Sequence, residues 1–443
     1  MFRAAFYEKE ITPPLGCFIP GYFNLRQGSE VADRLYARAA VLQNQTDTVA
    51  MISVDGCIMD ARLREIVCRR IEKYIPLKPE NVLLAYTHSH TGIPEFGYQA
   101  DGYLGDKDAA ENQEGYFDVF SKLIADCVIL AFYRLSDAEL CFGLGEVSGI
   151  SFCRNYLMKN STPQTNPGRL NPDIVKPFAE TDNELPVLLA KGTDGKPKGA
   201  VISFACHPDC VDGTAYSGDY ISELSMQLKK LYGEEFVTVF LLGTCGDINH
   251  FNVATEKDSP DHYRKMGRKI AGEAQKVIAF AEPVSGDTLT CRYEVMPLGR
   301  RPVSEEEIAQ ARHTVETVKE IPGVKIAADN TSKELYDLAM AKQFLNFIET
   351  TPETVNMPLQ VITVGDVKLY AFPNEIFCRY GKIVKKGSNA PKRFVASMCN
   401  ASHGYVPTED LFYDTIYEAS AGANCLEADA GERMAEKLLE MGR

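Results

Sequence analysis

The sequence lacks several features that would assign the protein to a particular class. No stretch of its 443 residues reaches the roughly 18 consecutive apolar residues that a membrane-spanning helix needs, so we expect no integral membrane segment. Residues 1–10 contain no apolar core of a secretory signal peptide, which favours a cytoplasmic location. Basic residues are in the minority, and the net charge is −14. Nucleic acids and anionic membranes bind basic surfaces, so we expect neither as a partner.

The sequence also shows no internal repeat, no low-complexity linker and no clear domain boundary. Its length allows one large domain or two. A hydrophobic content of 45% and a charged content of 24% are ordinary for a soluble globular protein. We therefore expect a single catalytic domain over residues 1–443, with a possible helical insertion at 304–350.

The cysteines do not form a zinc ribbon, because that motif needs two close pairs and only Cys206 and Cys210 form one. The segment Cys206-His207-Pro-Asp-Cys210 is nevertheless a metal-binding candidate in its own right. There are 13 cysteines, an odd number, and many lie in apolar, strand-like surroundings. We expect reduced, buried thiols in a reducing compartment.

Hydrophobic periodicity predicts an α/β protein with mixed β-sheets and outer helices. Short apolar runs bounded by turn residues predict strands over 4–12, 34–42, 48–54, 82–86, 139–147, 186–190, 199–205, 237–242, 289–296, 359–364, 367–372 and 393–398. Helical spacing predicts helices over 61–74, 116–135, 264–280, 305–319, 333–349, 376–386 and 431–441. Another helix begins at 217–219, with an expected inner face of Ile221, Leu224, Leu228 and Leu231. Residues 101–113 are expected to form a polar flap, and 159–177 a long loop.

The segment Thr87-His88-Ser89-His90-Thr91-Gly92 directly follows the strand predicted over 82–86. The chain has only seven histidines, and two of them fall here within three residues. Histidines at i and i+2 of extended backbone can point into one cleft, and imidazole is a common zinc ligand. Surface or hydrogen-bonded loop histidines are the alternative. Open α/β sheets bind ligands at the carboxyl ends of their strands, which favours a site.

Other predicted strands also end in side chains that can bind a metal or carry protons. These side chains are Asp55, His207, Asp247 with His250, Glu375 and Tyr405. Their recurrence predicts one shared cleft at the C-terminal ends of the strands. Three protein ligands and an open position are the arrangement of a catalytic zinc, whose bound water becomes a nucleophile near neutral pH. His262 and His313 lie in polar helical segments and are expected to be solvated.

Four segments carry a resemblance to a known family. They are Thr87–Gly92, the run Ser203-Phe-Ala-Cys-His207-Pro, the run Pro373-Asn-Glu375, and His403-Gly-Tyr405-Val-Pro-Thr408 followed by Tyr417-Glu418. Together with Arg34-Leu-Tyr-Ala-Arg38-Ala, these segments resemble the neutral/alkaline (non-lysosomal) ceramidase family, in order from about Ala4 to Ala421. The resemblance implies the catalytic N-terminal domain of that family.

The resemblance also implies roles for individual residues. A zinc ion, Zn2+, would be held by His88, His207, Glu375 and Tyr405. Three further side chains would contact the substrate or the oxyanion, namely His90, Arg154 and Tyr417.

Apart from the resemblance, we expect three aspartates to accept hydrogen bonds from the ligand histidines, because a metal-binding histidine usually donates the N–H of its other ring nitrogen. They are Asp55, Asp219 and Asp247. The alternative for each is an ordinary loop or helix-cap aspartate.

The chain departs from the family pattern at Asn249. The family has a serine in a Gly-Asp-Val-Ser-Pro segment, whereas this chain has Gly246-Asp247-Ile-Asn249-His250. An amide cannot attack a carbonyl, but it can donate a hydrogen bond to an oxyanion, and we expect Asn249 to do so. Secreted members of the family also carry a signal peptide and a C-terminal β-sandwich domain, and we expect neither here.

The implied function is a zinc-dependent hydrolase that cleaves the linear amide bond of a small N-acyl compound by means of a zinc-activated water. Two alternatives stay open. The first is a hydrolase of another small amide or ester. The second is a zinc-containing binding protein without turnover, because the family serine is missing. Nothing in the sequence indicates the oligomeric state.

Overall fold

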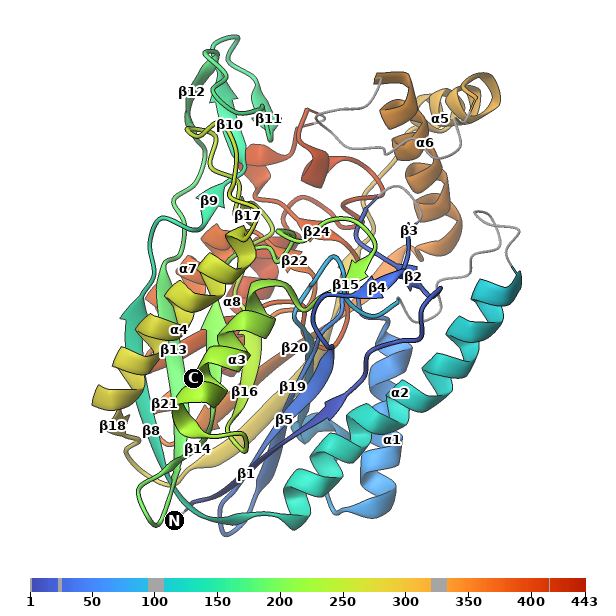
Figure 1. Ribbon diagram of the computed structural model, residues 1–443. Coiled ribbons are helices and arrows are strands. Elements are labelled where there is room, and N and C mark those ends of the chain that lie inside the picture. The colour runs from blue at the N-terminus through green and yellow to red at the C-terminus, as the bar shows by residue number, and fades with distance from the viewer. Residues whose placement is uncertain (1, 23–25, 95–106, 320–332, 414) are drawn as a thin grey trace.

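Two β-sheets packed face to face form the centre of the molecule, and helices cover both outer sides (Figure 1). The computed structural model describes residues 2–22, 26–94, 107–319, 333–413 and 415–443. The larger sheet has the order β16-β14-β13-β8-β1-β5-β6-β7, with β18 paired to β8. Its strands are β1 (Phe2–Glu10), β5 (Tyr36–Gln43), β6 (Thr48–Val54), β7 (Val82–Tyr86), β8 (Ser136–Glu146), β13 (Glu184–Gly192), β14 (Pro197–Phe204), β16 (Val237–Leu242) and β18 (Glu282–Pro283).

The smaller sheet has four strands in the order β19-β20-β21-β23. They are β19 (Leu289–Gly299), β20 (Thr354–Val364), β21 (Val367–Ala371) and β23 (Lys392–Ala396). Antiparallel and parallel pairs occur in both sheets. The predicted mixed α/β fold with outer helices is therefore confirmed.

The apolar runs in the sequence reflect burial of the large sheet on both faces. In β5, Ala39 and Val41 face the helices, whereas Ala40 and Leu42 face the smaller sheet. Strands covered on both sides need no polar alternation, which explains why they are continuous apolar segments. Ile362 of the smaller sheet belongs to the same core cluster between the sheets.

Helices cover the two outer faces (Figure 1). The large sheet is covered by α1 (Ala61–Tyr74), α2 (Lys107–Tyr133), α3 (Asp219–Tyr232) and α4 (His262–Phe280). The small sheet is covered by α7 (Cys378–Gly387) and α8 (Ala430–Met441). Two further helices, α5 (Glu305–Thr317) and α6 (Lys333–Thr350), share a small apolar cluster that includes Ala421 and Cys425.

The large sheet folds back on itself where β1 meets β8. These two strands pair only over Phe2–Ala4 and Ser136–Ala138. Beyond that short joint, Ser53 of β6 donates a hydrogen bond to the Phe240 carbonyl of β16 at 2.6 Å. The two halves of the sheet therefore lie side by side, and the ends of β7 and β14 approach one another.

The end of β23 connects the smaller sheet to this meeting point. The Ser397 amide donates to the Leu242 carbonyl at the end of β16, and the Asn400 amide donates to the Leu84 carbonyl of β7, both at 2.7 Å. Ala85 of β7 and Cys399 also pair with each other in an antiparallel β-bridge. The segment 397–400 thus lies between the two halves of the larger sheet and brings both sheets to one site.

Among the described residues, four pairs of short strands lie outside the two central sheets. They are β2 (Phe18–Ile19) with β3 (Arg26–Gln27), β4 (Glu30–Val31) with β15 (Ala215–Tyr216), β9 (Phe152–Cys153) with β17 (Ile248–Asn249), and β22 (Glu375–Ile376) with β24 (Tyr405–Val406). A separate three-stranded sheet consists of β10 (Asn155–Met158), β11 (Pro163–Thr165) and β12 (Ile174–Pro177).

Three sequence expectations need correction. The segment 159–177 is not only loop, because β11 and β12 pair with β10 across it. The expected flap at 101–113 is helical from Lys107 onward, while 101–106 lie outside the described residues. Leu231 is 49% exposed rather than on the inner face of α3, because the last turn of that helix projects into solvent before Gly233.

All thirteen cysteines are free thiols; Cys210 and Cys291 are partly buried and the other eleven are buried. Within the part of the chain that the structure describes, no helix combines the length and the apolar character needed to cross a membrane.

Candidate active site

His88 lies just beyond the end of β7 in a left-handed backbone conformation, with φ at 67°. A β-carbon makes this region unfavourable, and such strain is found where a side chain must be aimed at a functional site. Nδ1 of His88 lies 2.8 Å from the carbonyl oxygen of Cys57. Because a carbonyl can only accept, Nδ1 carries the proton and the neutral ring has its lone pair on Nε2.

His207 follows β14 and has the same orientation. Its Nδ1 lies 2.8 Å from the Cys245 carbonyl and 3.1 Å from the Ile248 carbonyl. The ring is fully buried. His207 therefore also presents Nε2, in the neutral form, as an electron-pair donor.

These two Nε2 atoms and the Glu375 carboxylate converge on one point. Nε2 of His88 lies 3.2 Å from Nε2 of His207, and each lies 3.1 Å from Oε2 of Glu375. Donors about 2.0 Å from a tetrahedral metal ion are separated by about 3.3 Å, so the three donor atoms are spaced to hold one. Three electron-rich atoms this close need a cation or a shared proton between them.

Burial and neighbouring charges shift the pKa values of the side chains in this cluster. Burial opposes the charged form of His88, but the Glu375 carboxylate and Cys57 together outweigh it and hold the pKa of His88 well above its usual range. The pKa of Glu375 is correspondingly held well below its usual range, against its burial, by His88 and His207. Burial and then the positive Arg154 lower the pKa of His207. A metal would therefore displace a proton from this cluster.

Glu375 and Tyr405 lie side by side because β22 and β24 pair in parallel, with Glu375 opposite Tyr405. The two side chains share a hydrogen bond, and burial followed by the negative Glu375 raises the pKa of Tyr405 well above its usual range. The Tyr405 ring stacks at 6.3 Å on that of His207. Gly246 allows the Glu375 backbone to approach closely, since a β-carbon at position 246 would lie 2.4 Å from the Glu375 carbonyl oxygen.

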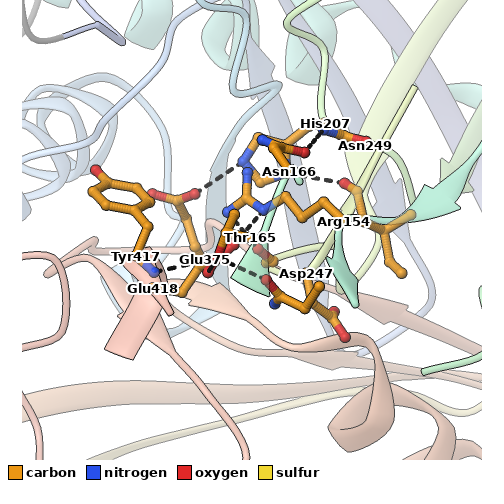
Figure 2. A network of polar contacts seen from close by, with 12 residues as sticks. Arg154, Thr165, Asn166, His207, Asp247, Asn249, Glu375, Tyr417 and Glu418 are labelled. Atoms are coloured by element: carbon orange, nitrogen blue, oxygen red, sulfur yellow. Dashed lines mark hydrogen bonds and ion pairs between the residues drawn. The ribbon is translucent and has the colours of Figure 1, made fainter. Parts of the chain in front are cut away.

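Arg154 is buried beside Tyr405. It belongs to the polar network of Figure 2. Its Nε donates to Glu418, and its Nη2 donates to the Gly246 carbonyl at 2.6 Å. The guanidinium centre lies 5.1 Å from the centroid of the Tyr405 ring. Arg154 thus joins the β9–β10 region to the segments that carry Glu375 and Tyr405.

Tyr417 contacts Tyr405 edge to face, with ring centroids 5.6 Å apart. Its amide donates to Thr165 Oγ1 at 3.2 Å, and Thr165 in turn donates to Glu418 at 2.7 Å (Figure 2). Burial, then the negative Glu375, raises the pKa of Tyr417. Its phenol therefore stays protonated and can donate a hydrogen bond.

His90 closes the other side of the cluster, with its Nε2 3.3 Å from Nε2 of His88. Burial and then His88 hold the pKa of His90 well below its usual range, so the ring is neutral. Nδ1 of His90 is buried and finds no hydrogen-bond partner among the described residues. Arg26 fixes the backbone here by donating to the His90 carbonyl at 2.6 Å.

Asn249 is buried in β17, next to Ile248. The Ile248 carbonyl accepts a hydrogen bond from the His207 amide. Its amide oxygen accepts from the Phe251 amide at 3.0 Å, and its Nδ2 donates to Asn166 at 3.2 Å (Figure 2). A side-chain amide has two N–H groups. One of them is thus available beyond the contact with Asn166.

The three aspartates do not take the hydrogen bonds of the ligand histidines, because backbone carbonyls do. Asp55 binds Arg38 at 2.8 Å. Asp219 accepts the amides of Val211 and Tyr220, and Asp247 accepts the Cys378 amide at 2.7 Å. They therefore fix strand ends and helix starts around the site, and they do not touch His88 or His207 through these bonds.

Two histidines differ from the sequence expectation. His250 does not join the His88–His207–Glu375 group, since its Nε2 lies 3.6 Å from Asp209 and its Nδ1 lies 3.7 Å from Asp258. His262 is not solvated but partly buried, and its ring lies 5.1 Å from that of His250. The turn between β17 and α4 folds back and brings the two rings together.

Sequence reasoning assigned no role to Glu418, the buried partner of Arg154. Its only signal was its place beside Tyr417. The carbonyls of Cys57 and Cys245 were missed as well, because any residue can supply a backbone carbonyl and no side-chain pattern marks it.

The mixed α/β fold thus brings a buried cluster of imidazole, carboxylate and phenol groups together at strand ends. The family described as neutral/alkaline non-lysosomal ceramidase, N-terminal, matches residues 8–288. This protein therefore belongs to the neutral/alkaline non-lysosomal ceramidase family, and it is a ceramidase-type hydrolase. None of the curated proteins matches the chain.

Two solved structures share the fold. The neutral ceramidase from Pseudomonas aeruginosa is 19% identical, with a TM-score of 0.73, over 100% of this chain and 74% of that one. A structure described as ceramidase complexed with C2 gives a TM-score of 0.74 at the same identity and coverage. At this identity the likeness concerns the fold.

Proposed function

We propose that the protein is a zinc-dependent amidohydrolase that cleaves the linear amide bond of a small N-acyl compound. The observation that carries the proposal is the convergence of His88 Nε2, His207 Nε2 and Glu375 Oε2 within 3.2 Å of one another. Two imidazoles and a carboxylate are a ligand set of catalytic zinc sites. Tyr405, beside Glu375, is the proposed fourth ligand.

Zinc, when bound, supplies Lewis acidity and lowers the pKa of a coordinated water to about 7. The protein supplies the rest. The carbonyls of Cys57 and Cys245 fix the tautomers of His88 and His207, so both rings present Nε2. Arg154 supports Tyr405 and the Gly246 backbone behind Glu375.

Three side chains are placed to act on the substrate. The protonated phenol of Tyr417 donates to the carbonyl oxygen as negative charge develops there, with Arg154 nearby. The neutral ring of His90 can accept the proton of the attacking water and pass it to the leaving amine as the C–N bond breaks. The products are a carboxylic acid and an amine.

The 443 residues are proposed to form one catalytic domain in which 304–350 is a helical insertion. The insertion packs against Ala421 and Cys425, close to Tyr417. Tyr336 of α6 is close enough to Glu418 that, after burial, this carboxylate contributes to raising the pKa of Tyr336 to about 12. We propose that α6 borders the part of the site that takes the acyl chain.

The test is hydrolysis of a panel of N-acyl amines and N-acyl amino acids of differing chain length, with matched esters. We expect amide hydrolysis that a chelator removes and added Zn2+ restores. Full activity of the metal-free protein would overturn the zinc mechanism. Bound zinc without turnover of any amide or ester would indicate a binding protein instead.

A further inference from the structure

A second group of metal-ligating side chains lies outside the candidate active site. Cys210, His250 and His262 each offer one ligand atom, and the three atoms lie within 4.8 Å of one another. Cys210 belongs to the loop after His207, His250 follows β17, and His262 is the first residue of α4. Their wide spacing in the sequence gives no recognisable motif.

His262 has a ring nitrogen that is free for a metal. The ring donates a hydrogen bond to the His250 backbone carbonyl. Nε2 of His262 is buried and finds no partner among the residues that the structure describes, so Nδ1 is the donor. A ring N–H held by a carbonyl, with the other nitrogen free, is how metal-binding histidines are oriented, and His88 and His207 show it too.

His250 lies between two carboxylates without a hydrogen bond to either. Its Nε2 is 3.6 Å from Asp209 and its Nδ1 is 3.7 Å from Asp258. Within the described ranges, Nδ1 of His250 and Oδ1 of Asp209 are buried atoms without a hydrogen-bond partner. Unsatisfied buried polar atoms are costly, so several of them together suggest a group that binds there.

Cys210 adds a soft ligand to the cluster. Its Sγ lies 3.5 Å from Sδ of Met266, which follows His262 by one helical turn on the same face of α4. The position of α4 is fixed by Gly267, where a β-carbon would lie 2.5 Å from the Tyr220 carbonyl of α3. Thiolate and imidazole with a nearby thioether select thiophilic transition metals over Mg2+ or Ca2+.

We propose that Cys210, His250 and His262 form a second binding site for a thiophilic transition-metal ion such as Zn2+. Sulfur and nitrogen ligands of a tetrahedral zinc lie about 3.5 Å apart, whereas the three ligand atoms here lie within 4.8 Å of one another, so the sulfur and a ring nitrogen must approach by at most about 1.3 Å. Binding converts the Cys210 thiol to a thiolate and releases one proton to solvent.

The site would join three segments next to the active site. Cys210 is three residues after His207, and Asp209 lies between the two histidine groups, near both His250 and His90. A metal there would tie the His207 loop to the start of α4. We therefore expect a structural ion that raises the melting temperature, separate from the ion proposed at His88, His207 and Glu375.

Metal loading of the full chain tests the site. The protein and the variants His88→Ala, Cys210→Ser and His88→Ala/Cys210→Ser are loaded with Zn2+ and analysed for metal content. We expect two equivalents in the parent protein, one in each single variant and none in the double variant. Mg2+ should neither bind at this site nor raise the melting temperature.

Cobalt gives a readout that is independent of activity. A thiolate-to-Co2+ charge-transfer band should appear in the parent protein and in His88→Ala, and should vanish in Cys210→Ser. A second variant, His262→Gln at the start of α4, should weaken this band. Two matched controls should keep the band. They are Cys291→Ser, the other half-buried thiol, and Cys57→Ser, whose sulfur lies 3.8 Å from His88 Nδ1.

A band that persists in Cys210→Ser, or a single equivalent that Cys210→Ser leaves unchanged, would overturn the second site. Failure of the proposed active-site metal would appear separately, as unchanged metal content in His88→Ala.

Discussion

Nε2 of His88 and Nε2 of His207 lie 3.2 Å apart, and in the neutral rings each carries a lone pair, because backbone carbonyls hold both Nδ1 protons. The carboxylate of Glu375 faces both at 3.1 Å. Such an arrangement is stable only when a proton or a metal ion lies between the donors. Against the burial of the ring, the Glu375 carboxylate and Cys57 hold the pKa of His88 above its usual range, which favours a shared proton between these donors when no metal ion is bound.

Metal binding should depend on these donors and on pH. We expect His88→Ala and Glu375→Gln to lose the active-site zinc equivalent, as measured by elemental analysis. Zinc affinity should fall as pH falls, because protons compete for the same donors. His313→Ala, at an exposed position of α5, is the matched control and should bind as the parent does. Unchanged zinc in His88→Ala would contradict the assignment.

Asn249→Ala should reduce kcat by on the order of 10²-fold, the usual loss for one oxyanion donor. The structure leaves one N–H of this amide beyond its contact with Asn166. The loss in Asn166→Ala should be smaller, because that change removes only the orienting partner.

We also expect no acyl-enzyme, since an asparagine is no nucleophile and a metal-activated water needs none.

Single-turnover reactions with hydroxylamine test for such an intermediate. A trapped hydroxamate, or amine released in a burst before acid, would show that a side chain attacks the carbonyl.

Glu418→Gln should destabilise the protein by about 3–5 kcal/mol, because it leaves the buried guanidinium of Arg154 without its counter-charge. Urea unfolding measures the loss. Glu180→Gln, in the exposed pair with Lys382, is the control and should cost less than about 1 kcal/mol. Equal effects of the two substitutions would show that the Arg154 pair does not hold the site together.

Asp219 should make stability fall as pH rises from about 4 to about 6. Burial raises the pKa of Asp219 to about 6 from an ordinary value of 3.8, so in this range the folded state holds a proton that the unfolded state has lost. This contribution is fully present below pH 4 and is lost through pH 6, and it amounts to about 3 kcal/mol.

Asp219→Asn lacks this titration and tests it. In the presence of a chelator, the free energy of unfolding of the parent minus that of the variant should decrease by that amount between pH 4 and pH 7. A difference that is constant with pH would show that the carboxyl titrates normally.

Local sequence was sufficient for the long strands of the two central sheets, but not for the short strands β11 and β12. The apolar runs at 82–86 and 237–242 lie at β7 and β16 with the predicted bounds, because strands buried on both faces leave an unbroken apolar signal. The histidines after β7 and β14 were visible as polar residues at strand ends for the same reason. Burial requires apolar residues within the strand, whereas the first residues beyond its end can carry polar, reactive side chains.

Tertiary structure decided which of those residues meet. His88 and His207 come together because the large sheet folds back at the short β1–β8 joint, and Glu375 joins them because segment 397–400 connects the small sheet to that place. His250 was expected in the same cluster, but it lies with Cys210 and His262 instead. Residues far apart in sequence are brought together by chain direction and sheet curvature, and no local pattern of side chains encodes either one.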